Sequence, residues 1–241
     1  MYTELLKMKG SRMFLVSLLG AVVSPLMTFF MLLGYHSDNP DEPLLFINLF
    51  NQTHLFITFL VGILLFALIA TYLINREFEE GTVKNLLTIP VSRIQLILSK
   101  MIILFVWIEV IMIFSYSLLI ILGFIGGFQG LNIAMVFTFL KKYLFTGFLL
   151  YLLTPIISVI TLIFRSYVPS IAFSIFFTVG NLIIIQSSKY VRFYPWGIPL
   201  LFTTDNYQPE YSLSISWFII LAFFIVSITA NLIYFYRTDI N

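Results

Sequence analysis

Six long, nearly uncharged apolar stretches occupy most of this 241-residue sequence. A helix needs roughly 20 mostly apolar residues to cross the roughly 30 Å hydrocarbon core of a bilayer, and each stretch meets that length. Only 10% of the residues are charged, whereas soluble domains carry about 25% charged residues. We therefore predict an integral membrane protein. The predicted membrane-spanning helices are 13–34, 55–74, 96–124, 143–164, 168–186 and 215–236.

Several other classes of protein are excluded by composition. Apolar and polar positions do not alternate within the stretches, so we expect an all-α fold and not a transmembrane barrel. The sequence has no cysteine for a disulfide scaffold. The net charge is only +2 and no basic, aromatic-interleaved patch occurs, which argues against nucleic acid as a partner. No repeat or Ser/Gly-rich linker interrupts the pattern, so residues 1–241 are expected to form a single transmembrane domain.

The distribution of basic residues predicts the orientation of the chain. Loops rich in Lys and Arg stay on the cytoplasmic side of a membrane. With the N-terminus inside, nine of the 13 basic residues lie on the cytoplasmic side. We therefore place both termini in the cytoplasm, including an amphipathic N-terminal segment at 1–12, and the acidic loop at 38–42 outside. The outer basic residues are Lys141 and Lys142, expected to snorkel at the outer end of the fourth span, together with Lys189 and Arg192.

The cytoplasmic segment at 75–95 contains the densest charge in the sequence. Seven of the 24 charged residues (13 basic plus 11 acidic) lie within 25 consecutive positions, 76–100. Val83, Leu86 and Leu87 follow the spacing of an amphipathic helix, and Pro90 disfavours helix at the preceding residue. From the pattern alone, an ordinary solvated loop and a short amphipathic helix that binds a partner remain open.

The run EEGTVKNLL at 79–87, followed by PVSR at 90–93 and by Lys100, resembles the signature of type-2 ABC exporter permeases. The resemblance is greatest to the small permeases of bacitracin, lantibiotic and related peptide-export or immunity systems. It extends to the layout of six spans, with this segment after the second span and a longer outer segment before the sixth. In that family, the matching segment couples the membrane domain to a cytoplasmic ATPase. The coupling residues that the resemblance implies are Glu77, Glu79, Glu80, Gly81, Thr82, Val83, Lys84, Asn85, Leu86, Leu87, Pro90 and Arg93.

The resemblance also implies partners and a location. The chain would be one half of a multi-pass exporter in a bacterial cell membrane, paired with an identical or homologous permease chain and two copies of the ATPase subunit. Such an exporter moves amphipathic or antimicrobial peptides, or lipid-like compounds, out of the cell. The sequence contains no G-x-x-x-x-G-K-[ST] motif. We therefore expect that the chain is not an enzyme itself, and that ATP and Mg²⁺ bind to the partner ATPase.

Glu109 is the one carboxylate deep within a predicted span. It follows Lys100 by nine residues, about 13.5 Å along a helix, which is close to the middle of the hydrocarbon core. An ionised carboxylate is costly there and often marks a functional site. Two interpretations remain open: a residue of the translocation pathway or subunit interface, or a neutral carboxyl hydrogen-bonded to Ser115, Tyr116 or a neighbouring helix.

The outer segment at 187–214 is rich in aromatic residues and proline. Tyr and Trp favour the headgroup region of a membrane, so the segment is expected to lie in the outer interface. In the resembled family, short re-entrant helices at this position cover the exit; a simple aromatic belt is the alternative. The candidate residues are Tyr194, Pro195, Trp196, Gly197 and Pro199.

Three smaller features complete the predictions. The glycines at 123–130 are interpreted as a turn at the outer end of the third span in preference to a dimer face. Pro25 and Pro155 should kink spans one and four. His36 and His54 are placed outside the membrane, and two histidines without cysteine give little basis for a metal site.

Two alternative functions stay open. A non-transporting immunity protein would bind a peptide without using nucleotide. A membrane-embedded enzyme is suggested by Glu79 and Glu80, but the predicted spans hold neither a Ser/His pair nor an Asp/Asp pair.

Overall fold

The computed structural model describes residues 11–79, 93–187, 189–204 and 213–237. These residues form helices and connecting loops without a β-strand, which confirms the all-α prediction. Six helical stretches within them are long and apolar enough to cross a membrane, as predicted. The amphipathic N-terminal segment at 1–12 lies almost entirely outside the described residues, as does the predicted coupling helix. The six stretches are Arg12–Asp38, Phe46–Arg76, Ile94–Ile125, Ile133–Phe164, Tyr167–Ile184 and Ser214–Tyr234.

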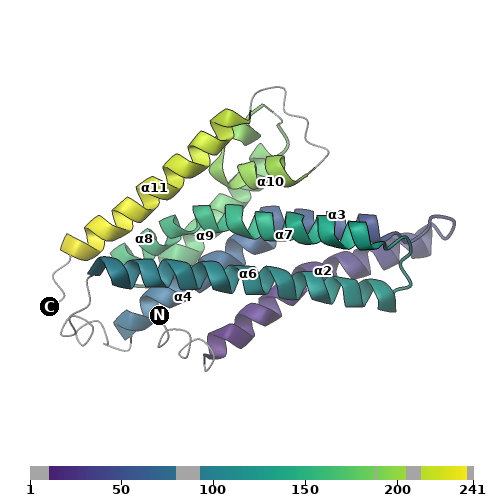
Figure 1. The fold of residues 1–241 in the computed structure, drawn as a ribbon, viewed down its shortest axis with the longest axis horizontal. Coiled ribbons are helices and arrows are strands. Elements are labelled where there is room, and N and C mark those ends of the chain that lie inside the picture. The colour runs from purple at the N-terminus through teal and green to yellow at the C-terminus, as the bar shows by residue number, and fades with distance from the viewer. Residues whose placement is uncertain (1–10, 80–92, 188, 205–212, 238–241) are drawn as a thin grey trace.

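Three long helices run side by side through the molecule (Figure 1). They are α2 (Arg12–Asp38), α6 (Arg93–Ile125) and α7 (Ile133–Leu153). The Ser11 hydroxyl caps α2 by accepting the Met13 N–H. Pro25 lies inside α2.

The second span begins nine residues earlier than predicted. It consists of α3 (Phe46–Phe56), the π-helix η1 (Ile57–Val61) and α4 (Gly62–Glu79). Asn48, Gln52 and other polar residues lower the hydropathy of α3, but Phe46, Leu49 and Phe50 share one helical face that is buried in the core. His54, which was predicted to lie outside the membrane, belongs to this longer helix, where only 3% of its surface is exposed.

The fourth span begins ten residues earlier than predicted, because Asn132 caps α7 by accepting the Met135 N–H. Lys141 and Lys142 therefore lie inside the helix, not at its outer end as predicted. Lys142 precedes the end of the span by 22 residues, about 33 Å along a helix, so the additional turns extend past a core of about 30 Å. At Pro155, where a kink was predicted, α7 ends at Leu153 and α8 (Pro155–Phe164) begins at the proline.

The outer segment folds back over the bundle between α9 (Tyr167–Ile184) and α11 (Ser214–Arg237). Its three short helices contact α7, α9 and α11, and α10 lies beside α7 in Figure 1. Trp196, Ile198 and Leu200 are buried, which favours the re-entrant arrangement over a simple aromatic belt. The three helices are η2 (Val191–Phe193), η3 (Pro195–Gly197) and α10 (Ile198–Thr203).

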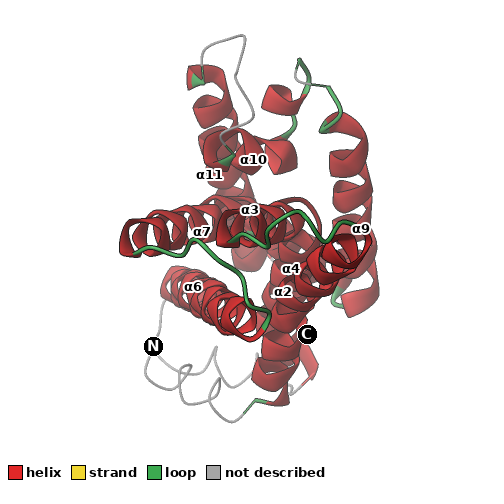
Figure 2. Cartoon of the chain, turned by 90° about the vertical axis from the view of Figure 1, so that its right-hand side faces the viewer, coloured by secondary structure: helices red, strands yellow, loops and turns green. Residues whose placement is uncertain are grey.

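Two loops cross the opposite end of the molecule from α4 and α11, and Figure 2 looks onto this end. The glycine-rich residues form the predicted turn: Gly127 and Gly130 have φ values of 70° and 82°, which favour glycine. Gly123 packs so closely against the ring of Phe46 that an added Cβ would clash with it. These glycines therefore serve packing and turning within the chain.

Candidate functional site

The two helices on either side of the predicted coupling segment are described, whereas most of the segment is not. Glu77 and Glu79 belong to the last turn of α4, and Arg93 is the first residue of α6. The other predicted coupling residues lie outside the described residues: Glu80, Gly81, Thr82, Val83, Lys84, Asn85, Leu86, Leu87 and Pro90.

Lys100 joins these two helices close to the coupling segment. Its ammonium Nζ donates a hydrogen bond of 2.8 Å to the Leu73 carbonyl oxygen of α4. The side chain is buried, and hydrogen bonds from charged groups are stronger than neutral ones. This hydrogen bond therefore connects α4 and α6 at this end of the bundle.

A second set of contacts connects α4 and α6 to the start of α2. The Tyr72 hydroxyl is 2.7 Å from Ser11 Oγ, and the Arg76 guanidinium lies 5.5 Å from the Tyr72 ring centroid. The Trp107 indole Nε1 donates to Ser17 Oγ at 3.0 Å. Sequence reasoning missed these residues, because a Tyr or Trp within an apolar span gives no sign of its partner.

The turn between α8 and α9 contacts the end of α4. Arg165 adopts a left-handed conformation with φ 49° at the end of α8. Its guanidinium carbon lies 5.4 Å from the Phe78 ring centroid, within the range of a cation–π contact. The last two turns of α4 therefore contact the start of α2, helix α6 and the turn after α8.

Glu109 lies where α6 packs against α7. Both carboxylate oxygens are buried, and neither has a hydrogen-bond partner among the described residues. Gly147 of α7 leaves room for the carboxyl group, since an added Cβ there would lie 2.9 Å from Glu109 Oε1. Hydrogen bonds to Ser115 or Tyr116, which one of the two interpretations offered, are absent among the described residues, and the Tyr116 hydroxyl donates to the Val136 carbonyl.

His54 brings a second titratable side chain to the same part of α7. Its Nε2 is 2.7 Å from Thr146 Oγ1. Because the Thr146 hydroxyl donates its single proton to the Lys142 carbonyl, it accepts the bond from His54. Adjacent residues of α7 thus contact His54 of α3 and Glu109 of α6. The described residues contain no group of three side chains arranged to hold a metal ion.

The predicted residues of the outer segment are brought together around α9. The Tyr194 hydroxyl donates to the Phe177 carbonyl at 2.7 Å, and burial raises the pKa of Tyr194 to about 12. Trp196 stacks on the Phe177 ring at 5.4 Å. Pro195 and Pro199 lie in the first turns of η3 and α10, where a missing N–H costs nothing.

Asn181 of α9, which sequence reasoning missed, connects the outer segment to the second span. Its side-chain amide donates to the Phe59 carbonyl of the π-helix at 3.4 Å. An added Cβ at Gly197 would lie 3.3 Å from Asn181 Oδ1, so the segment packs closely on the same side chain. Single-turn π-helices often occur at functional sites.

Comparison with known proteins adds two findings. A family model described as ABC-2 family transporter protein matches residues 1–181. The bacitracin transport permease protein BCRB of Bacillus licheniformis is 37% identical over 202 residues, which cover 84% of this chain and 97% of that protein.

Proposed function

The chain belongs to the ABC-2 transporter family, and from this premise we propose that it exports amphipathic or antimicrobial peptides, or lipid-like compounds. As a member of that family, it is a multi-pass transport subunit of the cell membrane and has an ABC ATPase as its partner. The proposal adds the outward direction, the cargo, and the coupling of transport to that ATPase. It also adds the composition of the complex: two ATPase subunits, which bind ATP and Mg²⁺, and a second permease chain, identical or homologous.

The joined cytoplasmic ends of α4 and α6 carry the proposed coupling. The ATPase would bind the segment Glu77–Arg93 through apolar residues such as Leu86 and Leu87, and charged residues would set the register. Movement of that segment would reach α4 and α6 together through Lys100. The Tyr72 and Trp107 contacts would pass the movement to α2.

Glu109 is proposed to lie on the translocation pathway or at an interface between the two permease chains. An unpartnered carboxyl group within an apolar bundle is costly, and either setting supplies a polar partner. The re-entrant segment formed by η2, η3 and α10 would then cover the outer exit of the pathway. The similarity to a bacitracin transport permease of Bacillus licheniformis supports a peptide as the cargo, because bacitracin is a peptide.

The coupling is tested by co-purification of the permease with its ATPase subunit. The variant Leu86→Asp with Leu87→Asp is expected to lose the ATPase, because buried apolar contacts become charged. Phe164→Asp is the matched control, since Phe164 is an exposed apolar residue at the same end of the bundle. Unchanged recovery of the ATPase with the double variant would refute the coupling role.

Transport into inside-out vesicles separates the exporter from the two alternatives. An exporter accumulates labelled peptide only when both ATP and the ATPase subunit are present. An immunity protein would bind peptide equally without nucleotide, and a membrane-embedded enzyme would produce a cleaved or modified peptide.

A further inference from the structure

A cavity of about 410 Å³ lies at the outer end of the bundle, between the end of α2, the loop 39–45 and α3. This volume is within the range of about 300–1,000 Å³ that is typical of ligand sites. Apolar side chains and a few polar groups line it. The lining residues that matter here are Leu32, Tyr35, Glu42, Leu44, Asn48 and Phe128.

Hydrogen bonds hold the walls of this cavity in place. The Phe46 N–H donates to the Gln129 carbonyl at 3.0 Å, and the Gln129 N–H donates to the Leu44 carbonyl at 2.7 Å. His36 Nδ1 lies 2.8 Å from the Glu42 carbonyl oxygen. The loop is therefore tied to both α2 and the turn after α6, and a preorganised site loses less entropy when a ligand binds.

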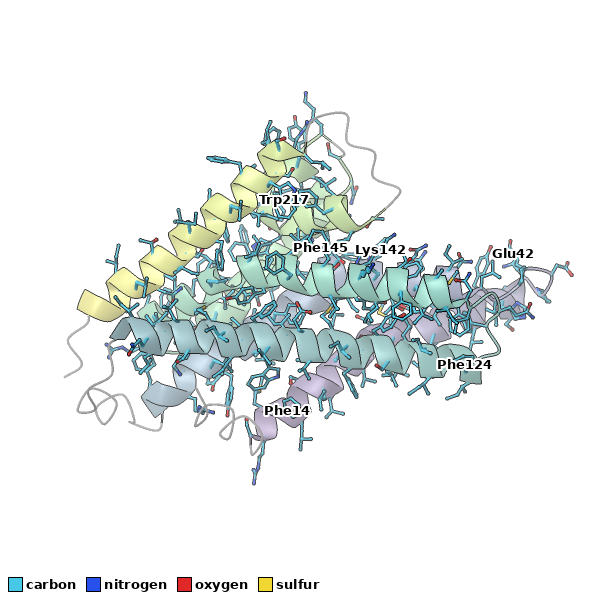
Figure 3. The ribbon with its side chains drawn as sticks, viewed as in Figure 1. Phe14, Glu42, Phe124, Lys142, Phe145 and Trp217 are labelled. Atoms are coloured by element: carbon cyan, nitrogen blue, oxygen red, sulfur yellow. The ribbon has the colours of Figure 1, made fainter. Side chains whose placement is uncertain are left out.

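The loop that borders the cavity is acidic. Asp38, Asp41 and Glu42 lie within five positions, and the loop 38–45 contains no Lys or Arg. Glu42 is exposed at the end of the molecule in Figure 3. Its carboxylate lies beside the Tyr35 hydroxyl and forms no ion pair with the described residues, so it remains available to a cation.

We propose that this cavity binds a cationic amphipathic peptide at the outer face of the permease. An ammonium group would pair with Glu42, and an apolar side chain would pack on Leu32, Leu44 and Phe128. Asn48 would hydrogen bond to the peptide backbone. This inference rests on the proposed function and identifies where the peptide contacts the outer end of the transporter.

The charge of the loop favours a peptide over a membrane lipid. An aminophospholipid also carries an ammonium group and apolar chains, but its phosphate would lie close to the Glu42 carboxylate, in a loop that also carries Asp38 and Asp41. Like charges repel at such distances, and the loop offers no basic side chain to offset the repulsion. A ligand with a net positive charge meets no such penalty.

Binding is measured with the full chain in nanodiscs of phosphatidylcholine, using a fluorescent synthetic peptide of alternating Leu and Lys. Glu42→Gln is expected to weaken binding about fivefold, the upper end for an exposed ion pair, and added salt should reduce the difference. Asp41→Asn is the matched control, because it removes the same charge from the same loop outside the cavity lining, and it should change affinity less than twofold. Asn48→Trp should weaken binding at least as strongly as Glu42→Gln by filling the cavity.

Three results would overturn the proposal. If Glu42→Gln and Asp41→Asn weaken peptide binding equally, the loop attracts the peptide only through its overall negative charge. Unchanged affinity in both Glu42→Gln and Asn48→Trp would mean that the peptide binds elsewhere. Competition by phosphatidylethanolamine in the nanodisc would mean a lipid site. ATP-driven transport by the unaltered complex is measured separately. Failure of the proposed peptide site can therefore be distinguished from failure of the proposed export function.

Discussion

Replacing Gly147 with alanine tests the packing around Glu109. An added Cβ would lie 2.9 Å from both Glu109 Oε1 and Met112 Cγ, and overpacking of this kind costs about 1–3 kcal/mol. Alanine is a better helix former than glycine by about 0.8–1.0 kcal/mol. The two effects together predict a net loss of up to about 2 kcal/mol in the free energy of unfolding.

Gly34 supplies the control for the helix-propensity effect. It lies within α2, and nothing lies within 4 Å of an added Cβ. Gly34→Ala should therefore stabilise the protein by about 1 kcal/mol. Unfolding of both variants is measured in the same detergent, and a similar stabilisation by Gly147→Ala and Gly34→Ala would refute the contact with Glu109.

A double-mutant cycle then assigns the cost to the carboxyl group. Glu109→Ala removes that side chain, so Gly147→Ala should be less destabilising in its presence, with a coupling energy of about 0.5–3 kcal/mol. Part of the cost remains, because Met112 still crowds the added methyl group. If the two changes in the free energy of unfolding are strictly additive, the added methyl group at position 147 does not clash with the Glu109 carboxyl group.

Three further substitutions test the connections between elements. Lys100→Met should reduce ATP-driven transport while the ATPase still co-purifies, because the hydrogen bond from α6 to α4 is lost; loss of the ATPase itself would contradict this. Trp107→Phe should lower the free energy of unfolding by about 1 kcal/mol through loss of the bond to Ser17, and thermal unfolding checks it. Asn181→Leu should slow transport without altering ATPase binding, because the contact with Phe59 is lost; an unchanged transport rate would count against it.

The sequence predicted which segments cross the membrane but placed two of their outer ends wrongly. The predicted ends follow the average hydropathy of each segment. Polar residues in α3 and the lysine pair of α7 lower that average, so both spans were predicted to begin too late in the sequence. The helices continue because one apolar face of each is buried within the bundle, and Asn132 starts α7 ten residues before the predicted boundary. Both features depend on tertiary packing and capping, which an average over a window of residues does not record.

The residues of the candidate site also differ in whether the sequence alone could identify them. Glu109 was identifiable because a carboxylate in an apolar segment is rare. His54, Trp107 and Asn181 were not, because each acts through a partner more than 80 residues away in the sequence. Their partners become evident only when the helices are placed side by side.

The membrane-spanning helices differ greatly in length, and this has a consequence for the surrounding lipid. The exposed apolar side chains of α9 extend from Val168 to Ile183, about 22 Å along a helix. The exposed residues beyond them include Tyr190 and Phe193, and aromatic residues favour the headgroup region. We therefore expect α9 to match a bilayer that is locally thinner than about 30 Å. Hydrophobic mismatch on this side makes bilayer thickness a determinant of how the re-entrant segment sits, so the acyl-chain length of the host membrane should tune the transporter.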